Sequence, residues 1–325
     1  MQARSLIWLS LAVALCAAAP RFAAGDAVLW EKTDARASFA LAHGGVSSRL
    51  RVAFDALLPR QTLRISAHGR DGTALAISVT GAPGLSRTEP GAWAYRAPAK
   101  PGSLARLRVT SAAAADEIAL TVFVLVPRAR IRDGRLNGYE IGRYPPPTEV
   151  QGARVEPPPG FIEVTAANQA TPVSAHFQLA DFSCKEGGDF PKYLVLDPRL
   201  PAKLEALLAA LHAHDIAARG LVVMSGYRTP AYNRALGNST AYSRHLWGGA
   251  ADVYVDESPR DGKMDDLNHD GVVDKRDAET LFAIADALDR APAEDWTVGG
   301  AGAYEATDAH GPFLHVDVRG HASRW

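Results

Sequence analysis

The sequence is poor in cysteine, since its 325 residues include only Cys16 and Cys184. Two thiols exclude a disulfide-rich scaffold and every zinc site built from several thiolates. Cys184 has no marked histidine partner in the sequence, which favours an inert thiol over a nucleophile. An excess of one charge is also missing, because 35 Lys and Arg residues stand against 36 Asp and Glu residues. Without a clustered basic excess, the chain shows no signature of nucleic-acid binding.

Long apolar runs are absent after the N-terminal 25 residues. There, Arg4, an apolar stretch over 6–19 and the small residues Ala23, Ala24 and Gly25 form the pattern of a secretory signal peptide, residues 1–25. That stretch is short for a transmembrane helix, and no later stretch reaches about 20 apolar residues. The sequence therefore predicts an exported protein without a transmembrane segment, periplasmic or extracellular after cleavage.

Three segments of different texture follow, and together they predict an α+β protein. Residues 26–127 contain short alternating runs separated by turn signals, which predict a small all-β, sandwich-like domain. This domain contains no cluster of catalytic residue types, so a spacer or docking module with an unknown partner is the favoured interpretation. Residues 128–175 contain two proline runs and are interpreted as a Pro-rich, extended connector. Residues 176–325 combine helical stripes with three strand-like runs at 221–224, 250–255 and 313–318.

The chemistry concentrates in two of those runs. On a strand over 250–255, Asp252 faces away from the apolar side chains, and on 313–318 His315 and Asp317 share one face. If the two strands pair, His245, Asp252 and His315 converge at one cleft. Two imidazoles and one carboxylate leave a fourth position open, which is typical of a catalytic zinc site, although other divalent ions also accept this ligand set.

Three motifs give this region a family resemblance. Ser243, His245, Gly248, Ala250 and Asp252 match S-x-H-x-x-G-x-A-x-D, residues 225–228 match S-G-Y-R, and residues 315–317 match H-x-D. Residues 176–325 thereby resemble the zinc D-Ala-D-Ala carboxypeptidases and murein endopeptidases of the LAS type. The resemblance implies a zinc peptidase domain with a central antiparallel sheet, and its substrates would be peptidoglycan peptides.

The resemblance also implies roles for single residues. His245, Asp252 and His315 would be the zinc ligands, and Arg228 would face the substrate. Tyr227, Ser243 and Trp247 would line the substrate groove, with core packing as the alternative for the two aromatic residues. Many relatives place a general-base Glu where this chain has Pro312. The candidates for proton transfer are Asp317, His310, Asp308 and Glu305, and Asp317 has the alternative role of orienting the site.

A second metal site is predicted between the two halves of the zinc motif. Within an acidic insertion over 256–277, residues 266–277 fit the calcium-loop pattern D-x-N-x-D-G-x-x-D-x-x-D, and Asp277 in place of Glu resembles the dockerin variant. The alternative is a solvated acidic loop. The predicted calcium ligands are the side chains of five residues and one backbone carbonyl: Asp266, Asn268, Asp270, Val272 (carbonyl), Asp274 and Asp277.

The leading hypothesis is an exported zinc metallopeptidase that cleaves peptidoglycan stem peptides or cross-links. Endopeptidase activity is slightly favoured over D,D-carboxypeptidase activity by the C-terminal motif. A catalytically inactive cell-wall binding module, stabilised by zinc and calcium, is the alternative, because relatives of the hedgehog type show that this zinc geometry also serves recognition. A calcium-dependent adhesion protein that uses the N-terminal domain is a third possibility.

Overall fold

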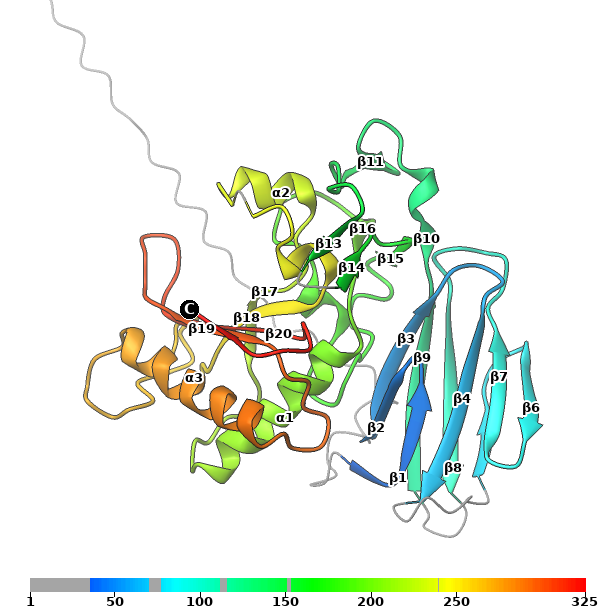
Figure 1. Cartoon of the computed structure of the whole chain (residues 1–325), viewed down its shortest axis with the longest axis horizontal. Coiled ribbons are helices and arrows are strands. Elements are labelled where there is room, and N and C mark those ends of the chain that lie inside the picture. Colours follow the sequence, from blue (N-terminus) through cyan, green and yellow to red (C-terminus); the bar gives the residue numbers. More distant parts are fainter. Residues whose placement is uncertain (1–35, 70–76, 112–115, 151–152, 239) are drawn as a thin grey trace, which may run out of the picture.

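The computed structural model describes residues 36–69, 77–111, 116–150, 153–238 and 240–325 (Figure 1). The predicted signal peptide, residues 1–25, lies outside the described residues. Strands predominate, which confirms the α+β class, and the described α-helices are α1 (Arg199–Ala213), α2 (Pro230–Ala235) and α3 (Lys275–Arg290). None of the described helices combines the length and the apolar character needed to cross a membrane.

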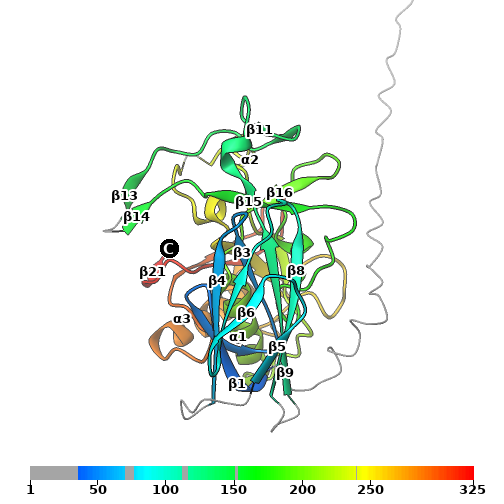
Figure 2. The same cartoon turned by 90° about the vertical axis from the view of Figure 1, so that its right-hand side faces the viewer.

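Two sheets pack face to face in the N-terminal part of the chain (Figure 2). Alternate residues such as Leu63 and Ile65 in one sheet, and Leu120 and Val122 in the other, are buried in a shared apolar core. The five-stranded sheet has the order β2-β1-β4-β7-β6 and the four-stranded sheet the order β3-β9-β8-β5. The strands are β1 (Arg36–His43), β2 (Val46–Leu50), β3 (Val52–Leu57), β4 (Thr62–Gly69), β5 (Ile77–Thr80), β6 (Leu85–Glu89), β7 (Ala92–Arg96), β8 (Leu104–Ser111) and β9 (Asp116–Val124).

The segment 128–175 is more than the extended connector that the sequence predicts. Its strand β15 (Gly160–Val164) pairs with both β10 (Val126–Pro127) and β16 (Lys192–Leu194). The side chains of Phe161, Ile162 and Val164 are buried in the larger core, which they share with α1 and the C-terminal sheet. The proline runs lie outside the described helices and strands, but the apolar residues that follow them are packed by partners distant in sequence. The same segment carries two small hairpins, β11 (Arg135–Leu136) with β12 (Tyr139–Glu140) and β13 (Thr148–Val150) with β14 (Ala153–Val155).

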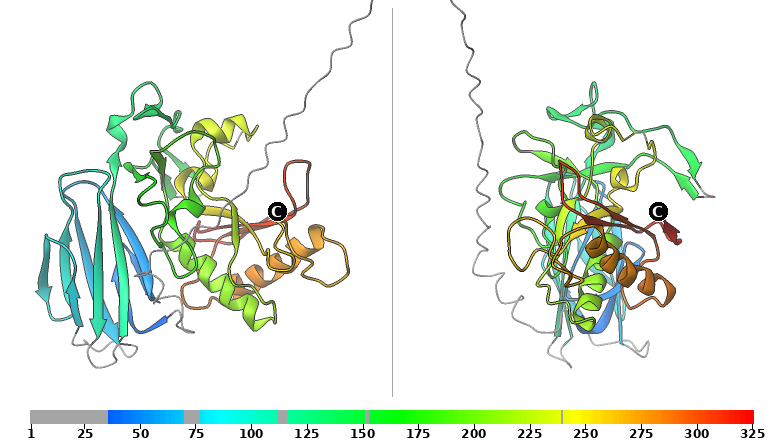
Figure 3. Two further views of the ribbon diagram at one scale, coloured as in Figure 1. Left: turned by 180° about the vertical axis from the view of Figure 1, so that it is seen from behind. Right: turned by 90° about the vertical axis from the view of Figure 1, so that its left-hand side faces the viewer.

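The C-terminal sheet positions the predicted metal ligands. It has the order β17-β18-β20-β19-β21, and β18 pairs antiparallel with β20 so that Asp252 lies opposite His315, which confirms the predicted pairing. Residues next to the ligands along each strand, such as Val253 and Val316, point into the core on the opposite face. Helices α1 and α3 lie along this sheet (Figure 3). Its strands are β17 (Val222–Ser225), β18 (Ala250–Tyr254), β19 (Gly300–Tyr304), β20 (Phe313–Asp317) and β21 (Ser323–Arg324).

A buried lysine ties α1 to the end of β20. The Nζ atom of Lys203 donates to the backbone carbonyls of Thr297, at 2.8 Å, and Asp317, at 2.9 Å, and lies 4.2 Å from the centre of the Trp296 ring. Burial lowers the pKa of Lys203 to about 8, although Asp289 and Asp317 attract the charged form. Burying the charged ammonium group therefore costs stability at neutral pH. The hydrogen bonds that it donates to two carbonyl oxygens offset part of this cost.

Lys203 predicts a specific dependence of stability on pH. Between pH about 8 and the ordinary value of 10.5, the unfolded chain retains the Lys203 proton while the folded chain has lost it, so the free energy of unfolding rises with pH. The rise amounts to at most about 3 kcal/mol. Chemical denaturation of the wild type and Lys203→Met across this range should show the rise only in the wild type. Parallel pH profiles for the two proteins would contradict the prediction.

Candidate metal centre

The chain reverses sharply between His245 and Asp252, and glycine makes the reversal possible. The 3-10 helix η4 (Arg244–Trp247) ends at Gly248, which adopts the left-handed conformation with φ 64°. A Cβ atom at Gly248 would lie 2.1 Å from the carbonyl oxygen of Val195, so no other residue fits there without a shift of the backbone. The turn leads directly into β18 and places His245 above the strand that carries Asp252.

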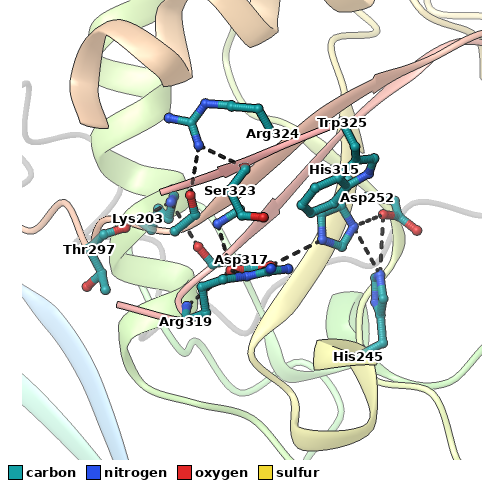
Figure 4. A network of polar contacts seen from close by, with 12 residues as sticks. Lys203, His245, Asp252, Thr297, His315, Asp317, Arg319, Ser323, Arg324 and Trp325 are labelled. Atoms are coloured by element: carbon teal, nitrogen blue, oxygen red, sulfur yellow. Dashed lines mark hydrogen bonds and ion pairs between the residues drawn. The ribbon is translucent and has the colours of Figure 1, made fainter. Parts of the chain in front are cut away.

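Three side chains meet at the predicted metal site (Figure 4). His315 Nδ1 lies 2.8 Å from Asp252 Oδ1, and His245 Nε2 lies 3.3 Å from each of these two atoms. One ligand atom from each residue falls within 4.8 Å of the others, and all three side chains are buried. The structure therefore brings together the three residues that the sequence selects as ligands.

Contacts behind the two imidazoles fix their orientation. His245 Nδ1 lies 2.7 Å from the carbonyl oxygen of Gly226, and because a carbonyl only accepts, the ring proton is assigned to Nδ1 and the lone pair to Nε2. His315 directs Nδ1 toward Asp252, while its Nε2 lies 3.6 Å from Asp317 Oδ2. Each ring thus offers one nitrogen to the site and uses the other outside it, an arrangement that suits zinc.

The charges in the cluster also suit a divalent cation. Burial by itself raises the pKa of Asp252, but His245 and His315 outweigh this effect and hold the pKa well below its ordinary value. Burial lowers the pKa of His245, so this ring is neutral near neutral pH. Burial also lowers the pKa of His315, but Asp252 and Asp317 outweigh this effect and raise it, so a metal ion would displace a proton from this ring. An ionised carboxylate beside a neutral imidazole is the protonation state that metal binding requires. The chemistry of the donors therefore fits zinc.

Arg228, expected to face the substrate, also holds Asp252. Its Nη2 donates to Asp252 Oδ2, and its Nε donates to Ser225 Oγ at 2.8 Å. Asp252 Oδ1 is left directed at the two histidines. Arg228 lines the cleft as well, so one guanidinium both orients a ligand and reaches the space where a substrate would bind.

Asp317 lies behind the metal cluster rather than in the cleft. Its Oδ1 accepts the backbone N–H groups of Gly300, at 2.8 Å, and Arg319, at 3.1 Å, and the Arg319 side chain contacts both carboxylate oxygens. Burial by itself raises the pKa of Asp317, but His315 and Arg319 hold it well below its ordinary value. A fully buried, ionised group with these partners fits the orienting alternative of the sequence analysis, not proton transfer to a substrate.

The other candidates for proton transfer are not in the cleft either. His310 Nδ1 lies 2.9 Å from the carbonyl oxygen of Gly311, and its ring packs edge-on against Phe313. Asp308 and Glu305 are exposed residues of the segment between β19 and β20. Among the described residues that line the cleft, the side-chain carboxylates and imidazoles are those of His245, Asp252 and His315 alone. The expected proton carriers are therefore displaced from the site because the 305–310 segment runs past it.

Of the three residues predicted to line the substrate groove, one lines the cleft and two do not. Ser243 lines the cleft, whereas Tyr227 is fully buried and its hydroxyl lies 2.8 Å from that of Tyr144. Trp247 donates from Nε1 to the carbonyl of Glu156 and packs edge-on against Tyr144, outside the described lining. For Tyr227 and Trp247 the substrate-groove expectation is replaced by the packing alternative, since the 128–175 segment covers both rings.

The cleft has a volume of about 570 Å³. The Trp325 ring packs 5.2 Å from the His315 ring, and its Nε1 donates to the Tyr304 hydroxyl. No periodicity in the sequence points to these contacts. A larger hollow, of about 970 Å³, lies along the β1-β4-β7 sheet, but the described metal cluster is in the smaller one. The described lining comprises Val150, Arg228, Asn238, Thr240, Tyr242, Ser243, Arg244, His245, Asp252, Tyr304, Phe313, His315, Arg319 and Trp325.

The acidic loop 266–277 is closed by bonds between its side chains and its own backbone. Asp266 accepts the N–H groups of Asp270, at 3.2 Å, and Gly271, at 2.8 Å. Asp277, fully buried at the start of α3, accepts those of Leu267 and Asp274, both at 2.8 Å. The loop therefore has the compact turn that its pattern predicts, and Asp277 caps the helix in a capping box with Asp274.

Comparison with known proteins finds a family match for one part of the chain. Residues 175–270 match the model of the family described as Peptidase M15, which is zinc-dependent. The matched region contains His245 and Asp252, while His315 lies beyond it. No curated protein and no solved structure matches the chain. The family match supports a peptidase, and the His-Asp-His cluster supplies a metal site of the kind that such a peptidase uses.

Proposed function

We propose that the protein is an exported zinc metallopeptidase that hydrolyses peptide bonds in peptidoglycan stem peptides or cross-links. The observation that carries the proposal is the buried cluster of His245, Asp252 and His315 at the wall of a cleft, in a region that matches the Peptidase M15 family. Cross-link endopeptidase activity is favoured over D,D-carboxypeptidase activity by the run Phe-x-His-x-Asp over residues 313–317.

In this proposal His245, Asp252 and His315 hold the zinc. When bound, zinc supplies a Lewis acid that polarises a peptide carbonyl and lowers the pKa of water. Arg228 keeps Asp252 oriented and presents its guanidinium to the cleft, where it donates hydrogen bonds to the oxygen on which negative charge develops. Asp317 fixes the ring of His315 from behind.

A binding module is the second candidate function, and one observation favours it. The described cleft lining contains no side-chain carboxylate or imidazole beyond the three ligands, so no side chain of these types is placed to move a proton. A zinc-holding recognition domain needs no such group. The two candidates differ in turnover: the binding module retains peptidoglycan on the zinc-loaded protein but releases no new fragment.

Defined muropeptides test the proposal. The zinc-loaded protein is incubated with a monomeric pentapeptide muropeptide and with a cross-linked dimer, and the products are weighed by mass spectrometry. Conversion of dimers to monomers indicates an endopeptidase, and loss of one D-Ala from the monomer indicates a carboxypeptidase. Unchanged masses for both substrates, with zinc bound, would refute the peptidase proposal and leave the binding module.

We also propose that Ca²⁺ binds the loop 266–277 through Asp266, Asn268, Asp270, Asp274, Asp277 and the carbonyl of Val272. The support is the fit of the sequence to a calcium loop and the compact turn with Asp277 at the start of α3. Calcium would offset the repulsion among the clustered carboxylates and fix the loop beside β18. Its proposed role is structural rather than sensory, as expected for a single unpaired loop in an exported protein.

The calcium proposal predicts a concentration-dependent stabilisation. At a calcium concentration about 100 times the dissociation constant, linkage gives about 2.7 kcal/mol, or about 5–10 °C in Tm. Differential scanning calorimetry with calcium and with magnesium checks this. Asp266→Asn should abolish the calcium shift, whereas Asp261→Asn, a comparable turn residue just before the loop, should keep it. Equal wild-type Tm values with and without calcium would contradict the proposal.

A further inference from the structure

Arg244 is a guanidinium of the cleft that no described residue pairs with. It lines the cleft, is half-buried and directly precedes His245 on η4. Among the described residues, its side chain has no ion-pair partner and donates no hydrogen bond. The other two guanidiniums of the lining are engaged, Arg228 with Asp252 and Arg319 with Asp317. Arg244 therefore differs from its neighbours in having free donors.

No carboxylate among the described residues near Arg244 is free to pair with its guanidinium. Asp317 attracts it, but the carboxylate oxygens of Asp317 already accept from Gly300 and Arg319. The backbone carbonyl of Arg244 accepts the N–H group of Gly249, so the turn that shapes the metal site also fixes where this side chain starts. A half-buried guanidinium has lost part of its water and has five donors to satisfy, which favours an anionic ligand.

The charge of the cleft also favours an anionic ligand. Its described lining contains three guanidiniums, those of Arg228, Arg244 and Arg319, and one side-chain carboxylate, that of Asp252, which is itself committed to the metal cluster and to Arg228. A site with this balance attracts negatively charged groups. A planar guanidinium fork matches a carboxylate in two parallel hydrogen bonds and discriminates it from an uncharged carboxamide.

We infer that Arg244 binds a free carboxylate of the substrate and thereby selects acidic peptides over their amidated forms. The inference rests on the proposed function and makes it more specific: the preferred peptide has an ionised carboxylate on a residue next to the scissile bond. Arg244 is in this account a specificity-determining residue. Arg228 and the metal ligands serve both kinds of substrate alike.

Two forms of one substrate test the inference. Cross-linked muropeptide dimers are prepared with the carboxylates next to the cross-link either free or converted to carboxamides, and kcat/KM is measured with the zinc-loaded full chain. The wild type should prefer the acid form by at least about tenfold, which equals about 1.4 kcal/mol. Arg244→Gln should bring this ratio close to one by slowing the acid form, and Arg244→Lys should keep part of the preference.

Controls separate this role from a structural one. Arg108→Gln removes an exposed guanidinium from the N-terminal sheets and should leave the substrate ratio unchanged. Arg244→Gln should keep the wild-type Tm, because no internal contact is lost. A wild type without preference, an Arg244→Gln variant that keeps the preference, or a Tm that falls by several degrees in this variant would overturn the inference.

Failure of the proposed function has a different signature. If the wild type cleaves neither form, the peptidase proposal fails, but the inference about Arg244 is then tested by calorimetric titration of both muropeptide forms into the zinc-loaded protein. The acid form should bind at least about tenfold more tightly, and Arg244→Gln should remove the difference. Equal dissociation constants in the wild type would overturn the inference.

Discussion

Replacing His245 by alanine is expected to abolish both zinc binding and peptide hydrolysis. His245 supplies one of two imidazoles, and the remaining His315 and Asp252 would leave two protein ligands, fewer than catalytic zinc sites use. A single hydrogen-bond donor to a developing charge is worth about 10²–10³ in turnover, so loss of the metal should reduce kcat by more than about a thousandfold. Metal content by atomic absorption and turnover of muropeptides measure the two effects on the same sample.

A second histidine substitution separates this effect from a general loss of histidine. His68→Ala removes an exposed ring on β4, where its Nε2 lies 3.1 Å from the Ser66 hydroxyl. This variant should retain zinc and activity. His245→Ala protein that still binds one zinc per chain and cleaves muropeptides at the wild-type rate would show that the metal centre lies elsewhere.

Asp317→Asn is expected to weaken zinc binding and to destabilise the fold. The substitution removes the charge that faces His315 Nε2 and Arg319 while keeping the shape of the side chain. Loss of a carboxylate behind a metal-binding histidine typically costs about 10–100-fold in metal affinity. Breaking a buried ion pair from one side costs about 3–5 kcal/mol, because the remaining charge stays buried. Zinc titration against a competing chelator and chemical denaturation measure the two losses.

The chain contains a matched control for this substitution. Asp197 and Arg199 form an ion pair with the same spacing as Asp317 and Arg319, but the Arg199 side chain is 45% exposed and the Arg319 side chain 16%. Asp197→Asn should cost at most about 1 kcal/mol and leave zinc affinity unchanged. Equal effects of the two substitutions on stability and on zinc affinity would show that Asp317 does not position His315.

The metal cluster could be predicted from the sequence because its determinants are local. Alternation along 250–255 and 313–318 places Asp252 and His315 on outward faces, and the glycine at 248 permits the turn that returns His245 to the strand. The pairing of the two strands, by contrast, is not determined by local sequence. The structure supplies that pairing through the residues opposite each other in β18 and β20.

Other parts of the site depend on packing between segments distant in sequence. Tyr144 and Glu156 of the segment 128–175 contact Tyr227 and Trp247 and cover them. No local sequence pattern predicts these contacts. The position of Trp325 beside His315 follows from the pairing of β19 with β21. Proline runs and chain ends carry no periodicity, so their partners cannot be read from alternation.

The displacement of the proton-transfer candidates follows from the path of one loop. The chain between β19 and β20 closes in a bridge between Thr307 and His310, and the His310 ring packs on Phe313. Spacing along the sequence places these residues close to His315, but it does not give the side of the sheet on which they lie. The sequence pattern places Asp317 on the correct face of the strand, but it does not show how deeply the side chain is buried. The contact with Gly300 on the neighbouring strand determines that burial.

Titration of metal-free protein with zinc tests whether His245, Asp252 and His315 form a single catalytic zinc site. Hydrolysis of a cross-linked muropeptide dimer is followed by mass spectrometry after each addition of zinc. Activity should rise linearly and stop rising at one zinc per chain, and His245→Ala should show no activity at any zinc level. Zinc binding at one equivalent without any product, or activity that does not depend on zinc, would contradict this expectation.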